Sequence, residues 1–148
     1  MDVLKSIKLL DNRNITFHFA GKFFNEKDKK GFESFIIENE LSEKVVYHGV
    51  VNGKAKKDLL EICDIFVLPT YYPKEGQPIS IIEAMGNGLA IITTNHAGIP
   101  DLISSDNGKF VNPCSATEIS NAISNLINNR TMLQALAKRN RKIVVEKL

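Results

Sequence analysis

The sequence predicts an α/β fold: a Rossmann-like, open, mostly parallel sheet with helices on both faces. Segments with strand and helix patterns alternate along the chain in the order βαβαβαβ, which is typical of strands joined by crossover helices. The strand-like runs, such as IFVL and LAII, are short and almost continuously apolar, which indicates strands covered on both faces. With 148 residues, 43% of them hydrophobic, the chain can bury one sizeable core, so we expect a single domain over residues 1–148.

The first half of the chain contains the first two predicted strands. Residues 2–10 place apolar side chains at helical spacing and end at the turn-forming run DNRN. Residues 15–21 (ITFHFAG) mix β-branched and aromatic residues and end in glycine, which indicates a strand running into a turn. Residues 26–40 carry the apolar stripe of an amphipathic helix, and the runs KVVYHG and KAKKDLLEIC then predict a strand over 44–49 and a helix over 54–63.

The second half continues the alternation. We expect strands at 64–69, 89–94 and 108–111, and helices at 78–87, 115–129 and 132–148. In open parallel sheets, ligands bind beyond the carboxyl ends of the strands, where loops enter the N-termini of helices. The candidate binding loops are therefore residues 21–25, 49–53, 69–78 and 93–100.

Charge and cysteine content exclude several classes of function. Nineteen Lys and Arg residues against 17 Asp and Glu leave a net charge of +2, too small for the basic surface that nucleic-acid binding requires. Cys63 and Cys114 lie far apart and outside any metal-ligand spacing, which argues against a disulfide framework or a zinc site. No apolar run approaches the roughly 18 residues of a membrane span. We expect a cytoplasmic domain without a transmembrane segment, or, in the full-length protein, a peripheral position at the inner face of the membrane.

The run EGQPISIIEAM has the features of an anion site. Pro78 suits the first turn of a helix, where its missing N–H group would have no helical partner. The amides of Ile79 and Ser80 would then point outward, and together with the helix dipole they suit a phosphate or diphosphate. Gly76 lets backbone approach a ligand closely. The alternative is an ordinary helix start whose amides bond to water.

Two glutamates flank this helix start. Glu83 lies about one turn inside an otherwise apolar helix, where a carboxylate is costly unless it is paired or reaches the site. Its two oxygens would suit the vicinal hydroxyls of a ribose, and the alternatives are a surface glutamate or a structural salt bridge. Glu75 precedes the helix on a polar loop, where a solvated charge is the alternative.

Other candidate ligand contacts lie in neighbouring loops. His96 and Gly98 belong to the loop TNHAGIP, where His96 could simply be exposed and Gly98 could let backbone run close to a ligand. Lys22, after HFAG, could neutralise a phosphate, as could the lysines at the start of the third helix, whose alternative role is a solvated face: Lys54, Lys56 and Lys57.

The remaining histidines do not form a catalytic pattern. His18 lies within a predicted strand, where we expect a core residue, and His48 ends a strand and could be buried or exposed. The chain shows no Ser/His/Asp pattern and no metal-ligand cluster. We therefore expect ligand recognition, no metal site, and no catalytic residue within this sequence.

The run EGQPISIIEAMGNGLAIITTNHAGIPDLI resembles the donor-site signature of GT-B-type, group 1 glycosyltransferases. Glu75 and Glu83 match its Glu-x7-Glu pattern, with Gly76 and Pro78 inside it, and weaker similarity covers about residues 1–130. The resemblance implies one half of a GT-B fold: the C-terminal, nucleotide-sugar-binding domain of a retaining glycosyltransferase. It also implies transfer of a hexose-type sugar to a glycan, lipid or polysaccharide acceptor, as in polysaccharide biosynthesis, without a bound metal or other cofactor.

The resemblance assigns roles to residues of the signature. It implies that Glu83 holds the ribose of a UDP- or GDP-linked donor and that Glu75 contacts hydroxyls of the donor sugar. The backbone over residues 76–80, which includes Gln77, Pro78, Ile79 and Ser80, would contact the diphosphate or the sugar. Gln77 stands where the family often has an aromatic residue, so the resemblance gives its side chain no role.

The chain also departs from the family pattern at both ends. The usual first strand, followed by a loop with an arginine and a lysine for the diphosphate, should precede Met1. Beyond the basic C-terminal helix, family members continue back to an N-terminal domain that binds the acceptor. We therefore expect a domain truncated at its first strand and at its C-terminus, and inactive by itself. The alternatives are a non-catalytic nucleotide-binding module and a nucleotide-sugar epimerase, the latter disfavoured because Glu-x7-Glu belongs to the transferases.

Overall fold

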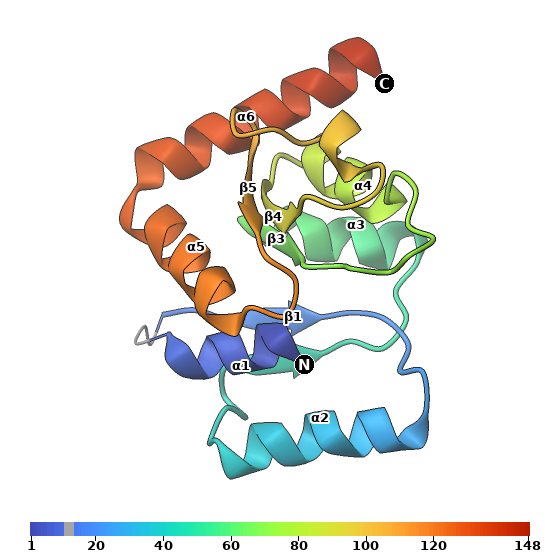
Figure 1. Ribbon diagram of the computed structural model, residues 1–148, viewed down its shortest axis with the longest axis vertical. Coiled ribbons are helices and arrows are strands. Elements are labelled where there is room, and N and C mark those ends of the chain that lie inside the picture. The colour runs from blue at the N-terminus through green and yellow to red at the C-terminus, as the bar shows by residue number, and fades with distance from the viewer. Residues whose placement is uncertain (11–13) are drawn as a thin grey trace.

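The strands of the computed structural model form two parallel sheets (Figure 1). The structure describes residues 1–10 and 14–148, so the turn expected over DNRN lies, apart from Asn14, outside the described residues. One sheet pairs β1 (Phe17–Phe19) with β2 (Val45–Tyr47). The other has the order β3 (Ile65–Leu68), β4 (Ala90–Thr94), β5 (Gly108–Val111). Every described pair is parallel, which confirms the predicted fold class, although the strands divide into two sheets.

Helices alternate with these strands nearly where the sequence places them. They are α1 (Asp2–Leu9), α2 (Glu26–Glu38), α3 (Gly53–Glu61), α4 (Ile79–Gly86), α5 (Ala116–Asn128) and α6 (Arg130–Lys147). The last helix begins two residues before the expected start because the Asn129 side chain accepts a hydrogen bond from the Met132 amide, 3.0 Å, and so caps it. The sequence did not predict the short 3-10 helix η1 (Ile99–Asp101).

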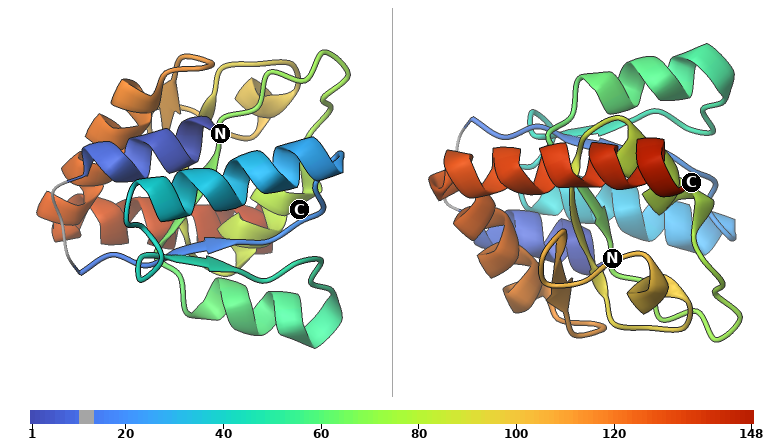
Figure 2. Two further views of the ribbon diagram at one scale, coloured as in Figure 1. Left: turned by 90° about the horizontal axis from the view of Figure 1, so that it is seen from below. Right: turned by 90° about the horizontal axis from the view of Figure 1, so that it is seen from above.

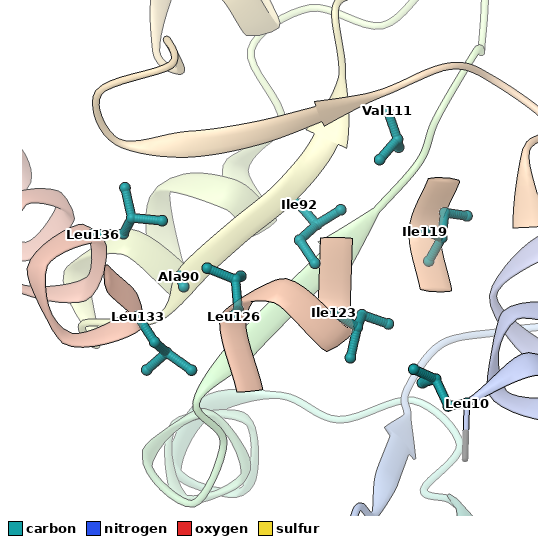
Figure 3. Close-up of a cluster of buried hydrophobic side chains, with 9 residues drawn as sticks. All are labelled: Leu10, Ala90, Ile92, Val111, Ile119, Ile123, Leu126, Leu133 and Leu136. Atoms are coloured by element: carbon teal, nitrogen blue, oxygen red, sulfur yellow. The ribbon is translucent and has the colours of Figure 1, made fainter. Parts of the chain in front are cut away.

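The three-stranded sheet is covered on both faces. Ala90 and Ile92 of β4 pack in one cluster with α5 and the start of α6 (Figure 3). Ile91 packs on the other face, with α4. Alternate residues of a strand point to opposite faces, so every residue of β4 is buried. In contrast, β3 is only half-buried along its length, and the expectation that IFVL is covered like LAII is therefore met only in part. A third cluster joins α1 and α2 to the β1–β2 sheet.

Helix α6 crosses the molecule beside β4 and ends next to α4 (Figure 2). Buried Asn140 attaches it there: its amide nitrogen donates to the carbonyl of Leu89, 2.9 Å, immediately before β4. Its amide oxygen accepts from buried Asn107, 3.0 Å, in the segment before β5. Since both asparagines are paired, this polar contact fixes the position of α6 without leaving a buried group unsatisfied.

His18 differs from its prediction. It is half-buried in β1 rather than a core residue, and its Nδ1 lies 2.9 Å from Nε2 of exposed His48. The reason is that the side of β1 away from β2 has no neighbouring strand among the described residues, and His18 lines the cavity beside it. Burial, and secondly the charge of His48, lower the pKa of His18 below its ordinary value.

Candidate functional site

The candidate site lies at the start of α4, beyond the carboxyl end of β3. Pro78 precedes the helix as its N-cap residue, so the helix begins one residue later than expected. The Pro78 carbonyl already accepts from Ile81, 3.0 Å, whereas the amides of Ile79 and Ser80 donate to no acceptor among the described residues. Both residues are exposed. The helix start therefore presents free N–H groups at the positive end of the helix dipole.

Glu75 lies in the loop before this helix and is held by Thr70, two residues beyond β3. The Thr70 hydroxyl donates to Glu75 Oε2, 3.0 Å, and the Glu75 amide donates to the carbonyl of Tyr72, 3.0 Å. The Thr94 hydroxyl, at the end of β4, donates in turn to the Thr70 carbonyl. Glu75 is thus half-buried with one oxygen fixed, and its other oxygen is available to a ligand.

Glu83 is paired with Lys56 of α3, 27 positions earlier in the chain. Lys56 Nζ lies 2.7 Å from Glu83 Oε1, and the two side chains are 37% and 33% exposed. The salt bridge that the sequence left open as an alternative is therefore present. It uses one carboxylate oxygen, so Oε2 has no partner among the described residues and can still accept from a hydroxyl.

The loop after β4 lies directly against the loop before α4. A Cβ atom on Gly98 would come within 2.9 Å of the Gly76 carbonyl oxygen and 3.2 Å of the Gln77 nitrogen. Gly98 therefore allows its backbone to lie close to the backbone of the neighbouring loop, whereas the sequence suggested a close approach to a ligand. His96 Nε2 donates to the Tyr72 carbonyl, 2.8 Å, so it joins the two loops and is half-buried rather than simply exposed.

Lys22 belongs to a different edge. It is exposed and follows β1, whose sheet is separate from β3 and β4. The Tyr47 hydroxyl donates to the Gly21 carbonyl, 2.8 Å, and the Gly21 amide donates to the Gly49 carbonyl, 2.8 Å, which fixes the backbone just before Lys22. The structure therefore brings the predicted residues of 75–83 together with His96 and Gly98, and it places Lys22 at the end of the neighbouring sheet.

Two further residues complete the site. Thr70 comes two residues after the end of β3, and a polar residue just beyond the carboxyl end of a parallel strand was a usable signal. Lys56 stands in a lysine-rich helix start, where nothing in the sequence distinguishes the lysine that reaches Glu83 from its neighbours. Lys56, Ser80 and Glu83 also line a cavity of about 940 Å³ that extends between β1 and β3.

The described residues contain no group of three or more His, Cys, Asp or Glu side chains placed to hold a metal ion. Among the same residues, no helix combines the length and apolar composition that crossing a bilayer requires.

The family model described as "Glycosyl transferases group 1" matches residues 1–143 of the chain. The chain belongs to this family. Over 82 residues it is 39% identical to the N,N'-diacetylbacillosaminyl-diphospho-undecaprenol alpha-1,3-N-acetylgalactosaminyltransferase of Campylobacter jejuni. That match covers 55% of this chain and 21% of the relative, so the chain corresponds to a minor part of this transferase.

Two solved structures show the same fold. The Anabaena protein HepE, in complex with UDP-glucose, superimposes with a TM-score of 0.88 at 20% identity, covering 99% of this chain and 40% of HepE. The C-terminal domain of LpcC, a glycosyl transferase group 1 family protein from Francisella tularensis, superimposes with a TM-score of 0.86 at 22% identity, covering 99% and 77%. These likenesses confirm the predicted GT-B-type half.

Proposed function

We propose that this chain binds the nucleotide-sugar donor of a retaining glycosyltransferase that transfers a hexose-type sugar. The observation that carries the proposal is the arrangement at α4: unpaired amides at the helix start, with a half-buried carboxylate on each side of it. The Anabaena neighbour in complex with UDP-glucose supports a UDP-linked donor, and a GDP-linked donor offers the same diphosphate.

The diphosphate is placed at the start of α4. The exposed amides of Ile79 and Ser80 donate to its oxygens, and the helix dipole favours its negative charge. The backbone of Gly76 and Gln77 forms the adjacent wall, which Gly98 supports from behind. When the bond from the sugar to the diphosphate breaks, charge develops on the leaving group, and groups already directed at it stabilise that charge without rearranging and without a metal ion.

The two glutamates recognise neutral hydroxyl groups on either side of the diphosphate. Lys56 fixes Glu83 by its Oε1 and leaves Oε2 for the ribose. Thr70 fixes Glu75 by its Oε2 and leaves Oε1 for the sugar. Because each carboxylate is held by one partner before the donor arrives, less side-chain freedom is lost on binding. The acceptor is a glycan, lipid or polysaccharide bound by the remainder of the full-length enzyme.

Titration calorimetry with UDP, UDP-glucose and GDP tests the proposal. Glu83→Ala is expected to weaken UDP binding about 10- to 100-fold, which corresponds to one charged hydrogen bond of about 1.5–3 kcal/mol. The matched control is Glu146→Ala, an exposed glutamate of α6 that pairs with Lys142. Equal UDP affinity in the Glu83→Ala variant and the unchanged chain would leave Glu83 with a structural role only and would overturn its assignment to the ribose.

A further inference from the structure

Strand β2 is an edge strand among the described residues, because it pairs only with β1. The carbonyl of Lys44 and the amide of His48 bond to β1. By the alternation of the strand, the backbone groups of Val45 and Tyr47 point away from β1. The Val45 amide already donates to the Leu41 carbonyl, 3.1 Å. The Val45 carbonyl and both backbone groups of Tyr47 are therefore available to a further strand.

Apolar side chains lie exposed beside this edge. Ile37 of α2 is 71% exposed, and Val46 and Tyr47 of β2 are 39% and 42% exposed. A groove of about 210 Å³ lies between α2 and β2, and its lining is mostly apolar: Phe32, Glu33, Ile36, Ile37, Val45 and Tyr47. Helix α2 lies at the end of the molecule opposite α6 (Figure 1). The free edge of β2 and this groove together form one surface, which we call the β2 edge surface.

Charged residues beside the groove complement one another when two copies are placed antiparallel. Lys30 stands two turns before Ile37 on the same side of α2, and Glu40 follows the end of the helix. Both Lys30 and Glu40 are exposed, and neither has an ion-pair partner among the described residues. If the two-fold axis passes near Phe35, Lys30 of each copy lies opposite Glu40 of the other. Ile37 of each copy then lies opposite Glu33 of the other, beside its groove. A second copy of the chain therefore supplies both the opposite charges and an apolar side chain.

The spacing of the strands agrees with the spacing of the helices. The Phe32 ring lies 5.2 Å from that of Phe19 in β1 and 5.8 Å from that of Tyr47 in β2, so α2 covers the strand pair. If β2 of one copy pairs with β2 of another, the centres of the two strand pairs lie about 9.6 Å apart, because neighbouring strands are about 4.8 Å apart. Packed helices lie about 8–10 Å apart. Pairing of the strand edges therefore brings the two α2 helices into contact as well.

We propose that two copies of the chain associate through the β2 edge surface. The β2 strands pair antiparallel about a two-fold axis, so that the Tyr47 amide of each copy donates to the Val45 carbonyl of the other. The two copies then share one sheet of the order β1–β2–β2–β1, which both α2 helices cover. The candidate donor site lies on other loops, so the inference does not depend on donor binding.

The size of the surface sets the strength of the dimer. Helix α2 is about 20 Å long, and a strip of this length that includes the strand edge buries roughly 300–500 Å² of each copy. A standard stable interface buries about 800 Å² of each partner. We therefore expect a weak dimer with a Kd on the order of 0.1–1 mM. Sedimentation equilibrium between about 0.02 and 1 mM chain measures this constant. A chain that stays monomeric over this range overturns the proposal.

Exchange of the two charges tests the ion pairs. Lys30→Glu alone and Glu40→Lys alone each place like charges opposite one another, and each is expected to weaken the dimer about tenfold. The double variant restores opposite charges, and its Kd is expected to return to within about threefold of the original. Within one chain the two residues lie about 15 Å apart along the helix axis, too far for contact. Restoration therefore requires a second copy.

The matched control for the charge exchange is Lys138→Glu, which reverses an exposed charge on α6. This variant is expected to keep the Kd of the original chain, and urea unfolding shows whether each variant is folded. A dimer that forms with the same Kd in all four variants would lie on another surface, and the proposal would be wrong.

Hydrogen exchange in the unchanged chain locates the contact without any substitution. The Tyr47 amide is expected to exchange about twofold or more slowly at 1 mM than at 0.02 mM chain, in proportion to the fraction of dimer. The His18 amide, which points away from β2 on the free side of β1, is expected to keep its rate. Protection of His18 in place of Tyr47 would mean that the copies meet at β1, and it would overturn the proposal.

Discussion

At the residue scale, the contact between Gly98 and the loop before α4 allows the least change. A Cβ atom there would lie 2.9 Å from the Gly76 carbonyl oxygen, and this neighbour is backbone rather than a flexible side chain. Gly98→Ala is therefore expected to displace the backbone of Gly76 and Gln77, which forms the proposed diphosphate wall. We expect a loss of about 1–3 kcal/mol in the free energy of unfolding, measured in urea, and weaker UDP binding by calorimetry.

Gly86→Ala is the control for this prediction. A Cβ atom on Gly86 meets only Val144 Cγ1, at 3.5 Å, and the residue lies in α4, where alanine is the better helix former. We expect this control to keep both stability and UDP affinity. If Gly98→Ala behaved in the same way, the close packing of the two loops would have no importance for the site.

A second residue-scale prediction concerns Lys56, whose ammonium group holds Glu83. Lys56→Met keeps much of the aliphatic length and removes the charge, so the Glu83 carboxylate loses its fixed orientation. Because both side chains are about a third exposed, stability is expected to change by less than about 1 kcal/mol. UDP affinity is expected to fall several-fold. Lys54→Met, two positions earlier in the chain, breaks an exposed ion pair with Asp58; it is the control and leaves affinity unchanged. Equal UDP affinities in the two variants would reduce the Lys56 contact to a surface ion pair.

At the scale of elements, α6 is held by a polar contact that its sequence pattern does not reveal. Asn140→Leu leaves the Leu89 carbonyl and one bond of the Asn107 side chain without a partner in a buried environment. The expected cost is about 1–3 kcal/mol in the free energy of unfolding, measured by urea denaturation. Gln134→Leu, at an exposed position of the same helix, is the control and should change stability by less than about 0.5 kcal/mol. A stable Asn140→Leu variant would show that apolar packing alone positions α6.

The pairing of β1 and β2 gives the fold a predicted dependence on pH. Burial, and then His48, lower the pKa of His18 from 6.5 in the folded chain, so below that pH the unfolded state binds the proton more readily. The free energy of unfolding should therefore be constant above about pH 6.5 and fall as the pH drops below it. Melting temperatures across this range, compared with His18→Gln, measure the effect. The His18→Gln variant should lose this part of the slope, whereas His48→Gln should keep the part that burial causes.

Sequence patterns predicted most elements because period and composition are local properties. IFVL, AIITT and the stripe of α5 lie where expected, and the signature around Glu75 and Glu83 located the candidate site. Tertiary contacts could not be predicted from these local patterns. Lys56, for example, pairs with Glu83 only because α3 lies near α4 in the folded chain. Similarly, His18 has the local environment of a core strand residue and became partly exposed because β1 lacks a neighbour on one side among the described residues. The prediction that β3 is covered on both faces was met only in part for the same reason.

At the scale of the whole molecule, our proposal makes the start of α4 one wall of a donor site. Its exposed face carries Ile79, 72% exposed, beside the loop of Tyr71 and Tyr72, which are 58% and 59% exposed. Transfer needs an acceptor held against the donor in near-attack geometry, and water kept away from the activated sugar. The described residues provide contacts to the diphosphate, the ribose and the sugar in our proposal, and they provide no second wall.

We therefore expect the chain to bind the donor without catalysing transfer of its sugar. Calorimetry should detect UDP binding to the 148-residue chain, whereas a coupled assay for UDP release from UDP-glucose should give no rate above the uncatalysed background. The full-length protein should release UDP when acceptor is present, and Glu83→Ala in that protein should lower kcat/KM about 10- to 100-fold, in step with the loss of UDP affinity.

Turnover by the 148-residue chain would show that it holds a complete active site. UDP binding without transfer by the full-length protein, with any lipid or glycan acceptor, would indicate a nucleotide-binding module. Conversion of UDP-glucose to an epimer without acceptor would identify an epimerase.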